Sequence, residues 1–165
     1  KAKNIVITGG SAGGGLAASL GLKIRDPGSP MPGCCALGTP EADLTETGDS
    51  FETLDTIDVV SQHRLTPSVM LYAGGHDLRD PYLSAVFGDF SKGYPPTILT
   101  TGTRDIFLSN TVRLHRVLRK GGIEAELHVW EATPHGGFFG APEDAELGAE
   151  QARFVRKHLK IKDRS

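Results

Sequence analysis

A glycine-rich segment near the start of the chain constrains the fold more than any other feature. The apolar residues 5–7 lead into residues 8–15, which contain five glycines around Ser11, and a run rich in Leu and Ala follows at residues 16–20. The apolar run suits a buried strand, the glycines permit a tight turn, and the last run suits a helix. We therefore predict a strand, a sharp turn and a helix in direct succession.

Two kinds of chemistry use a turn of this type. The spacing Gly9-x-Ser11-x-Gly13 suits a nucleophile elbow, which lifts a serine hydroxyl above a sheet and aims the Ala12 backbone N–H at a developing oxyanion. Glycines at positions 9, 13 and 15 would also let backbone N–H groups approach a pyrophosphate at a helix N-terminus. Residues elsewhere in the chain must distinguish a nucleophile elbow from a pyrophosphate-binding turn.

Strand and helix patterns alternate along the remaining chain. The predicted strands span residues 34–38, 97–101 and 124–130, and the predicted helices span residues 12–23, residues 106–120 and a segment from Pro142 onward. This order predicts an α/β fold, a parallel sheet with right-handed crossovers and helices on both faces. The length of 165 residues suits a single domain over 1–165. Apolar and polar residues alternate at 124–130, which predicts a strand at the sheet edge.

Residues 39–93 form a helical or irregular insertion without a clear strand pattern. We predict short helices at 51–61 and 67–73, the second with Thr66 as its N-cap, and a turn or short helix from Asp80 to about Phe87. Loops that connect strands often carry binding residues. We expect this insertion to build one wall of a ligand pocket.

Composition limits the binding partners and the cellular compartment that we expect for the protein. The net charge is −2 without a block of like charge, which argues against nucleic acid and against an anionic membrane surface as partners. No apolar run is long enough to span a bilayer, and no secretory signal is visible. Cys34 and Cys35 are adjacent, so a disulfide between them would be strained. We expect buried free thiols and a cytoplasmic protein.

Three polar residues follow three of the predicted strands. Ser11 follows the first, Asp105 follows residues 97–101, and His135 follows residues 124–130. Open parallel sheets place their sites at the carboxyl ends of the strands, so these side chains should meet. An imidazole can take the proton of a serine hydroxyl, and a carboxylate fixes the imidazole tautomer. The sequence therefore predicts a Ser-His-Asp catalytic triad.

Each of these residues also has a plain structural explanation. Ser11 suits a tight turn, Asp105 suits the N-cap of the helix from residue 106, and His135 suits a loop. Asp77 and Asp80 are other acids, but they lie in the insertion. Other histidines are expected on helices or a strand, namely His63, His115, His128 and His158. No C-x-x-C and no suitable histidine pair exists, so we expect no metal site.

A dinucleotide-binding interpretation stays open as an alternative. The pattern of Thr8, Gly9, Gly13 and Gly15 resembles the nucleotide fingerprint of short-chain dehydrogenases/reductases, which bind NAD(P). Against it, residues 34–38 end without an acid or arginine to hold a ribose. None of the three tyrosines is followed by a lysine four residues later, as that family's catalytic pair requires. A non-catalytic α/β binding module is the other alternative.

The joint pattern of motifs resembles the C-terminal half of a hormone-sensitive-lipase-type esterase of the α/β-hydrolase superfamily, over nearly the whole chain. The matching motifs are Gly-Gly-Ser-Ala-Gly-Gly at 9–14, Thr39-Pro40 with Asp43-Leu44-Thr45, Tyr72-Ala73-Gly74-Gly75 with Asp80-Pro81, Pro95-Pro96-Thr97, Gly102-Thr103-Arg104-Asp105, and Pro134-His135-Gly136-Gly137-Phe138. The resemblance implies Ser11 as nucleophile, Asp105 as acid, His135 as base and Ala12 as one oxyanion donor. It implies a small or medium acyl ester as substrate and no cofactor.

The chain departs from that family in two ways. Gly10 stands where the family often has aspartate, which should change local hydrogen bonds only. The family's upstream oxyanion loop, early strands and cap have no counterpart before residue 1. We therefore expect a fragment that needs its N-terminal half for full activity, with an exposed apolar edge at residues 4–8. The edge strand at 124–130 predicts pairing across a homodimer.

Overall fold

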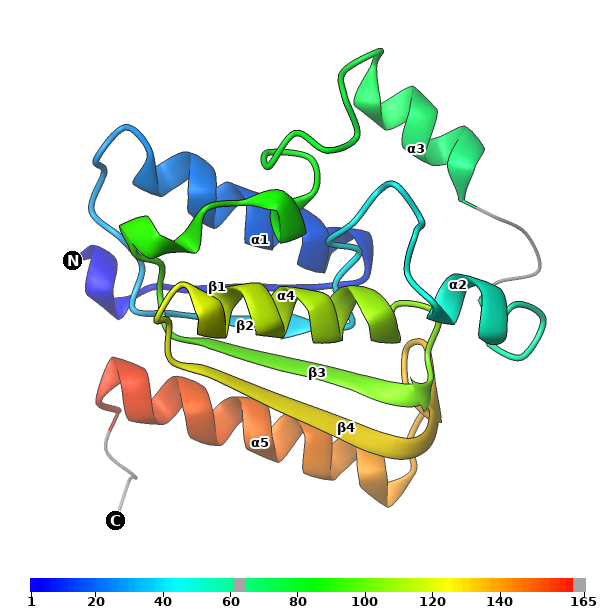
Figure 1. Cartoon of the computed structure of the whole chain (residues 1–165). Coiled ribbons are helices and arrows are strands. Elements are labelled where there is room, and N and C mark those ends of the chain that lie inside the picture. Colours follow the sequence, from blue (N-terminus) through cyan, green and yellow to red (C-terminus); the bar gives the residue numbers. More distant parts are fainter. Residues whose placement is uncertain (61–64, 162–165) are drawn as a thin grey trace.

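The computed structural model describes residues 1–60 and 65–161 and contains a four-stranded parallel sheet with the order β1-β2-β3-β4 (Figure 1). The strands are β1 (Val6–Gly10), β2 (Cys34–Gly38), β3 (Thr97–Arg104) and β4 (Ala125–Pro134). All three neighbouring pairs are parallel. The predicted α/β class is confirmed, and so is the edge position of the last strand.

Helices cover both faces of the sheet (Figure 1). Helices α1 (Ala12–Arg25) and α4 (Leu108–Lys120) lie on one face, and α5 (Pro142–Leu159) lies on the other. Successive strand residues point to opposite faces. Cys35 and Leu37 accordingly pack into the core under α1 and α4, whereas Cys34 and Ala36 pack against Phe154 of α5. The fully apolar strand β2 is therefore the centre of both cores.

The two cysteines are free and buried, as predicted. Because they alternate across β2, their thiols enter different cores. Burial raises the pKa of the Cys35 thiol to about 12. Cys35 therefore behaves as a small core residue rather than a reactive thiol.

Within the segment between β2 and β3, the described residues form only helices, turns and loops. The helical elements are α2 (Ser50–Thr53), α3 (Thr66–Ala73), η2 (Ala85–Phe87) and η3 (Phe90–Lys92), and a further short element, η1 (Ala2–Asn4), precedes β1. In Figure 1, α3 projects away from the sheet, above α2.

Two local predictions in this segment were wrong. The helix expected at 51–61 ends at Thr53, because Thr56 has a positive φ of 67° and Asp58 turns inward as a buried hydrogen-bond acceptor; Ser61 lies outside the described residues. The N-cap of α3 is Leu65 rather than Thr66. The Thr66 hydroxyl donates instead to the carboxylate of Glu46, which ties the start of α3 to the loop after β2.

Strands β3 and β4 extend beyond their predicted ends, to Arg104 and Pro134. Their C-terminal ends approach so closely that a Cβ at Gly102 would lie 1.9 Å from the Thr133 carbonyl oxygen. Helix α4 begins at Leu108, later than predicted, because residues 105–107 form a turn in which the Asp105 carboxylate accepts the Phe107 N–H. These contacts bring the two loops that follow β3 and β4 together.

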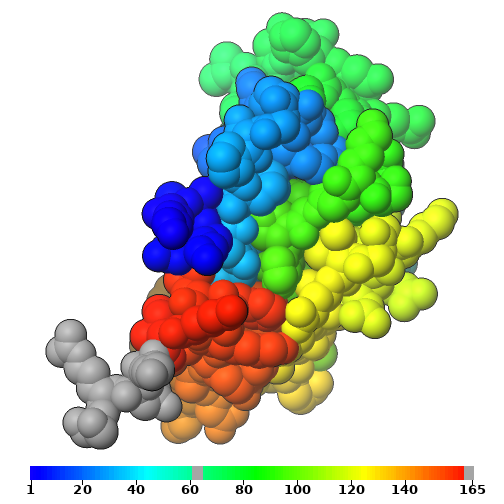
Figure 2. Space-filling model, turned by 90° about the vertical axis from the view of Figure 1, so that its left-hand side faces the viewer, coloured from blue at the N-terminus to red at the C-terminus, as the bar shows by residue number. Residues whose placement is uncertain are grey.

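Strand β1 forms one edge of the sheet and β4 forms the other. Ile5, just before β1, is 55% exposed. The N-terminal residues lie beside the C-terminal end of α5, as Figure 2 shows, and a Cβ at Gly33 would meet both Lys3 and Leu159. Across residues 1–60 and 65–161, no helix is both long and apolar enough to cross a bilayer.

Candidate active site

The turn between β1 and α1 holds Ser11 in a conformation that side chains rarely adopt. Its φ is 57° and its ψ is −130°. The Ser11 N–H donates to the Gly38 carbonyl oxygen, 3.0 Å away, and the Ser11 carbonyl oxygen accepts from Gly14 and Gly15. A Cβ at Gly9 would lie 2.2 Å from the Gly13 carbonyl oxygen. Gly9 and Gly15 are therefore required by close backbone approach within the protein, which gives them a use other than phosphate binding, whereas a Cβ at Gly13 would meet no described atom within 4 Å.

The structure brings the three predicted triad residues together. His135 Nε2 lies 2.9 Å from Ser11 Oγ, and His135 Nδ1 lies 3.1 Å from the Asp105 carboxylate. His135 and Asp105 are buried, and Ser11 is partly exposed. These distances form an unbroken hydrogen-bonded series from carboxylate to imidazole to hydroxyl, over the C-terminal ends of β1, β3 and β4.

Surrounding donors hold the Asp105 carboxylate as a hydrogen-bond acceptor. Thr39 Oγ1 and Thr101 Oγ1 donate to its Oδ2, the latter at 3.2 Å, and the Phe107 N–H donates to its Oδ1 at 2.8 Å. The N-cap of α4 is Phe107 rather than Asp105. Facing such an acceptor, His135 Nδ1 carries the proton, which leaves Nε2 free to accept from Ser11.

Asp58 is a buried acid of the site that sequence reasoning did not find. Its Oδ1 accepts the His135 N–H at 3.0 Å, and its Oδ2 accepts the Ile106 N–H at 2.6 Å. The carboxylate thus joins the loop after β3 to the loop after β4. No local pattern marks Asp58, because it comes from an irregular segment far away in the chain.

Three residues place atoms that could bind a metal ion close together. One such atom each from Asp58, Asp105 and His135 lies within 4.8 Å of the other two, a group drawn from residues 1–60 and 65–161. Both Asp58 oxygens already accept backbone N–H groups, and His135 Nδ1 faces Asp105. The arrangement suits proton transfer better than cation binding.

Competing influences set the basicity of His135. Burial lowers the pKa of its imidazole, but the hydrogen bond with Asp105 and the charges of Asp105, Asp58 and Glu41 outweigh burial. The net result is a pKa raised above the ordinary imidazole value. A raised pKa makes the neutral ring a stronger general base.

Ser11 opens into a mostly apolar pocket of about 460 Å³. Much of the wall comes from the segment between β2 and β3, including α3. Its apolar lining includes Leu16, Leu44, Leu65, Val69, Leu83 and Phe107. Ala12, the first residue of α1, also lines the pocket, at a position where helix N–H groups lack intrahelical acceptors.

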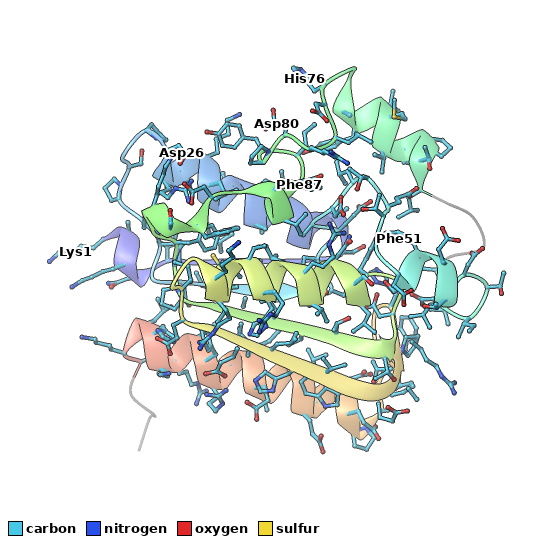
Figure 3. All side chains as sticks on the ribbon, in the orientation of Figure 1. Lys1, Asp26, Phe51, His76, Asp80 and Phe87 are labelled. Atoms are coloured by element: carbon cyan, nitrogen blue, oxygen red, sulfur yellow. The ribbon has the colours of Figure 1, made fainter. Side chains whose placement is uncertain are left out.

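Two aromatic side chains pack in series against the His135 imidazole. Phe107 meets the His135 ring edge-on with 5.1 Å between centroids, and Phe51 meets Phe107 in the same way at 5.8 Å. Phe51 lies in α2 beside the C-terminal ends of the strands (Figure 3). These contacts restrict rotation of the His135 ring.

The other candidates from the sequence do not reach this site. His115 contacts the Ala125 carbonyl oxygen, His128 stacks on Trp130, and His158 packs on Phe154. Asp77 and Asp80 accept backbone N–H groups in local turns. His63 lies outside the described residues.

Comparisons with known proteins point in one direction. The family model Abhydrolase_3, described as "alpha/beta hydrolase fold", matches residues 1–139. An acetyl-hydrolase of Streptomyces hygroscopicus is 30% identical over 138 residues, which are 79% of this chain and 44% of that protein. An esterase of Acinetobacter venetianus is 26% identical over 139 residues, which are 79% of this chain and 43% of that protein.

Solved structures agree in fold over nearly the whole chain. The crystal structure of an esterase is 42% identical with a TM-score of 0.90, over 96% of this chain and 50% of that one. An esterase from the bacterial hormone-sensitive lipase family is 30% identical with a TM-score of 0.91, over 96% of this chain and 55% of that one. The chain thus spans less than half the length of these curated relatives and about half of these structures.

Proposed function

The chain belongs to the family of proteins with the α/β-hydrolase fold, and from this premise we propose that it acts as a serine carboxylester hydrolase on small or medium acyl esters. Membership confirms the resemblance to hormone-sensitive-lipase-type esterases that the sequence motifs indicated. The observation that carries the proposal is the series from Asp105 through His135 to Ser11, with contacts of 3.1 and 2.9 Å.

The proposed reaction has two steps. Ser11 Oγ attacks the ester carbonyl while His135 Nε2 takes its proton, and the Ala12 N–H stabilises the oxyanion. The tetrahedral intermediate collapses, the alcohol leaves with the proton from His135, and an acyl enzyme remains. Water, activated by His135, then releases the acid and restores Ser11. Asp105 holds the imidazole tautomer and stabilises its cation throughout.

A partner segment is the second part of the proposal. We infer that a segment equivalent to the N-terminal half of the relatives pairs with β1 and completes the oxyanion hole and the pocket. The exposure of Ile5 at 55% and of Leu16 at 59% supports an apolar partner along β1 and α1. One oxyanion donor is worth about 10²–10³ in rate, so this segment should matter for turnover. Pairing of β4 across a homodimer and a cytoplasmic location stay predictions.

Labelling with a fluorophosphonate tests the triad. The expected result is one adduct on Ser11, found by intact mass and peptide mapping, with none on Ser11→Ala and a rate at least about 100-fold lower for His135→Ala. Ser29→Ala, which removes an exposed serine, should label like the wild type. An adduct elsewhere, or undiminished labelling of His135→Ala, would refute the triad.

Fusion to a known N-terminal half tests the partner segment. The part of the 42% identical esterase that precedes its match to this chain can be joined to residue 1. Turnover of p-nitrophenyl acetate should rise by about 10²–10³ over the chain alone. Equal turnover with and without the added half would contradict the role proposed for it.

A further inference from the structure

Glu41 is held against the nucleophile by its own backbone. It follows β2, and its N–H donates to the Ser11 carbonyl oxygen at 3.0 Å. On the other side, a Cβ at Gly15 would lie 2.0 Å from the Glu41 carbonyl oxygen. Glu41 is therefore locked to the same turn that positions Ser11, and its side chain starts at a fixed place beside the reacting atoms.

Glu41 lines the pocket that contains Ser11, and its carboxyl group interacts electrostatically with His135. Among the described residues of this largely apolar lining it is the one acid, and it is only partly exposed. No hydrogen bond or ion pair to its carboxylate is formed within the described ranges 1–60 and 65–161. Burial and the charge of Glu46 raise the pKa of Glu41, and His135 lowers it. The carboxyl group thus lies where a substrate would lie, near the charge of the imidazole.

A carboxylate on an apolar wall without a partner is poorly solvated, and a cation of the ligand would relieve that cost. A neutral ligand group of the same shape would not relieve the cost of poor solvation, and an anionic group would be repelled by the carboxylate. We propose that Glu41 determines specificity, so that the pocket favours esters that carry an ammonium or similar cationic group near the scissile bond. The inference rests on the proposed function, because it assigns the substrate class of that same site.

Two phosphonate probes of equal shape separate the effect of ligand charge from the effect of ligand shape on the labelling rate. Both are p-nitrophenyl methylphosphonates, and the second ester group is 2-(trimethylammonio)ethyl in one and 3,3-dimethylbutyl in the other. In each reaction a bond forms between Ser11 Oγ and phosphorus, p-nitrophenolate leaves, and the serine proton passes to His135 Nε2. Intact mass gives the rate of adduct formation with the chain itself, without any need for turnover.

The measured quantity is the ratio of the cationic to the neutral rate, compared between the wild type and Glu41→Gln. This double comparison cancels the intrinsic reactivity of the probes and any change in the basicity of His135. The ratio should fall about tenfold in Glu41→Gln, which corresponds to about 1.4 kcal/mol. The wild-type ratio should also fall as salt is added. Glu143→Gln, an exposed position on α5 with the same charge change, should keep the wild-type ratio.

The outcomes separate this inference from the proposed function. An unchanged ratio in Glu41→Gln, while Ser11 is labelled readily by the neutral probe, would overturn the role of Glu41 and leave the triad intact. An equal fall of the ratio in Glu143→Gln would show that the preference for the cationic probe comes from the overall charge of the chain. That result would also overturn the role of Glu41. Failure of the neutral probe to label wild-type Ser11 would refute the proposed function, and this inference with it.

Discussion

Replacing Asp58 with asparagine should weaken the fold and also make the site active at lower pH. The two oxygens of Asp58 accept backbone N–H groups from His135, at 3.0 Å, and from Ile106, at 2.6 Å. Asp58 is 4% exposed, so water cannot replace either bond. The amide of asparagine offers one acceptor oxygen, and its NH₂ group would face the second N–H.

The loss of stability follows from that one unpaired donor. A buried polar group without a partner costs about 1–3 kcal/mol, so Asp58→Asn should lower the free energy of unfolding by about that amount. The fall in Tm should be about 2–4 °C for each kcal/mol. Urea unfolding followed by circular dichroism measures the effect.

The pH effect has a definite sign. The charge of Asp58 is one of the influences that raise the pKa of His135, and Asp58→Asn removes it, so this pKa should fall. His135 must be neutral to accept the Ser11 proton, and the acid limb of the labelling rate should therefore move to lower pH. A histidine with a raised folded pKa adds stability below its unfolded pKa, which is lost as pH rises through the folded pKa. The stability deficit of Asp58→Asn should thus be larger in acid.

The rate of fluorophosphonate labelling against pH is the assay, and Asp55→Asn is the matched control. Asp55 lies three residues earlier in the chain and is exposed, so the same chemical change there should alter neither quantity. An acid limb that stays in place or moves to higher pH in Asp58→Asn would refute the electrostatic role of Asp58. An unchanged free energy of unfolding would refute its role as acceptor for the two loops.

Three further substitutions test a backbone contact and a hydrogen bond at the site, and the helix α5. Gly15→Ala should destabilise the fold by about 1–3 kcal/mol and slow labelling, because the new Cβ would lie 2.0 Å from the Glu41 carbonyl oxygen; wild-type urea unfolding would contradict this contact. Gly148→Ala, with open space around it on exposed α5, should instead raise the free energy of unfolding by about 0.5–1 kcal/mol, and a loss would contradict the helix there. Thr39→Val keeps the side-chain shape but removes a donor to Asp105, so labelling should slow about tenfold with Tm nearly unchanged; wild-type labelling would show that the bond is dispensable.

The sequence predicted the parts of the molecule that depend on neighbouring residues. Apolar runs and, at 124–130, the alternation of apolar and polar residues identified the four strands, and Ser11, Asp105 and His135 were found because each follows a strand. Asp58 was missed because its position depends on hydrogen bonds to two loops that follow distant strands.

Local patterns also failed where tertiary contacts override them. The stretch expected as a helix at 51–61 has suitable residues, but the inward turn of Asp58 ends the helix at Thr53. Thr39 belongs to one of the matching motifs, but its contact with Asp105 forms only when β2 and β3 lie side by side. Strand pairing, rather than any local pattern, creates that part of the site.

At Ser11, the proposed catalytic role and the stability of the chain place opposite demands on one residue. With φ at 57° and ψ at −130°, its backbone occupies a region where a side chain costs about 1–3 kcal/mol and glycine costs little. The neighbouring strand and helix must supply that energy continuously in order to keep the hydroxyl raised toward His135. Selection for a more stable chain would therefore favour glycine at position 11, and the proposed role of Ser11 as the nucleophile accounts for the serine there.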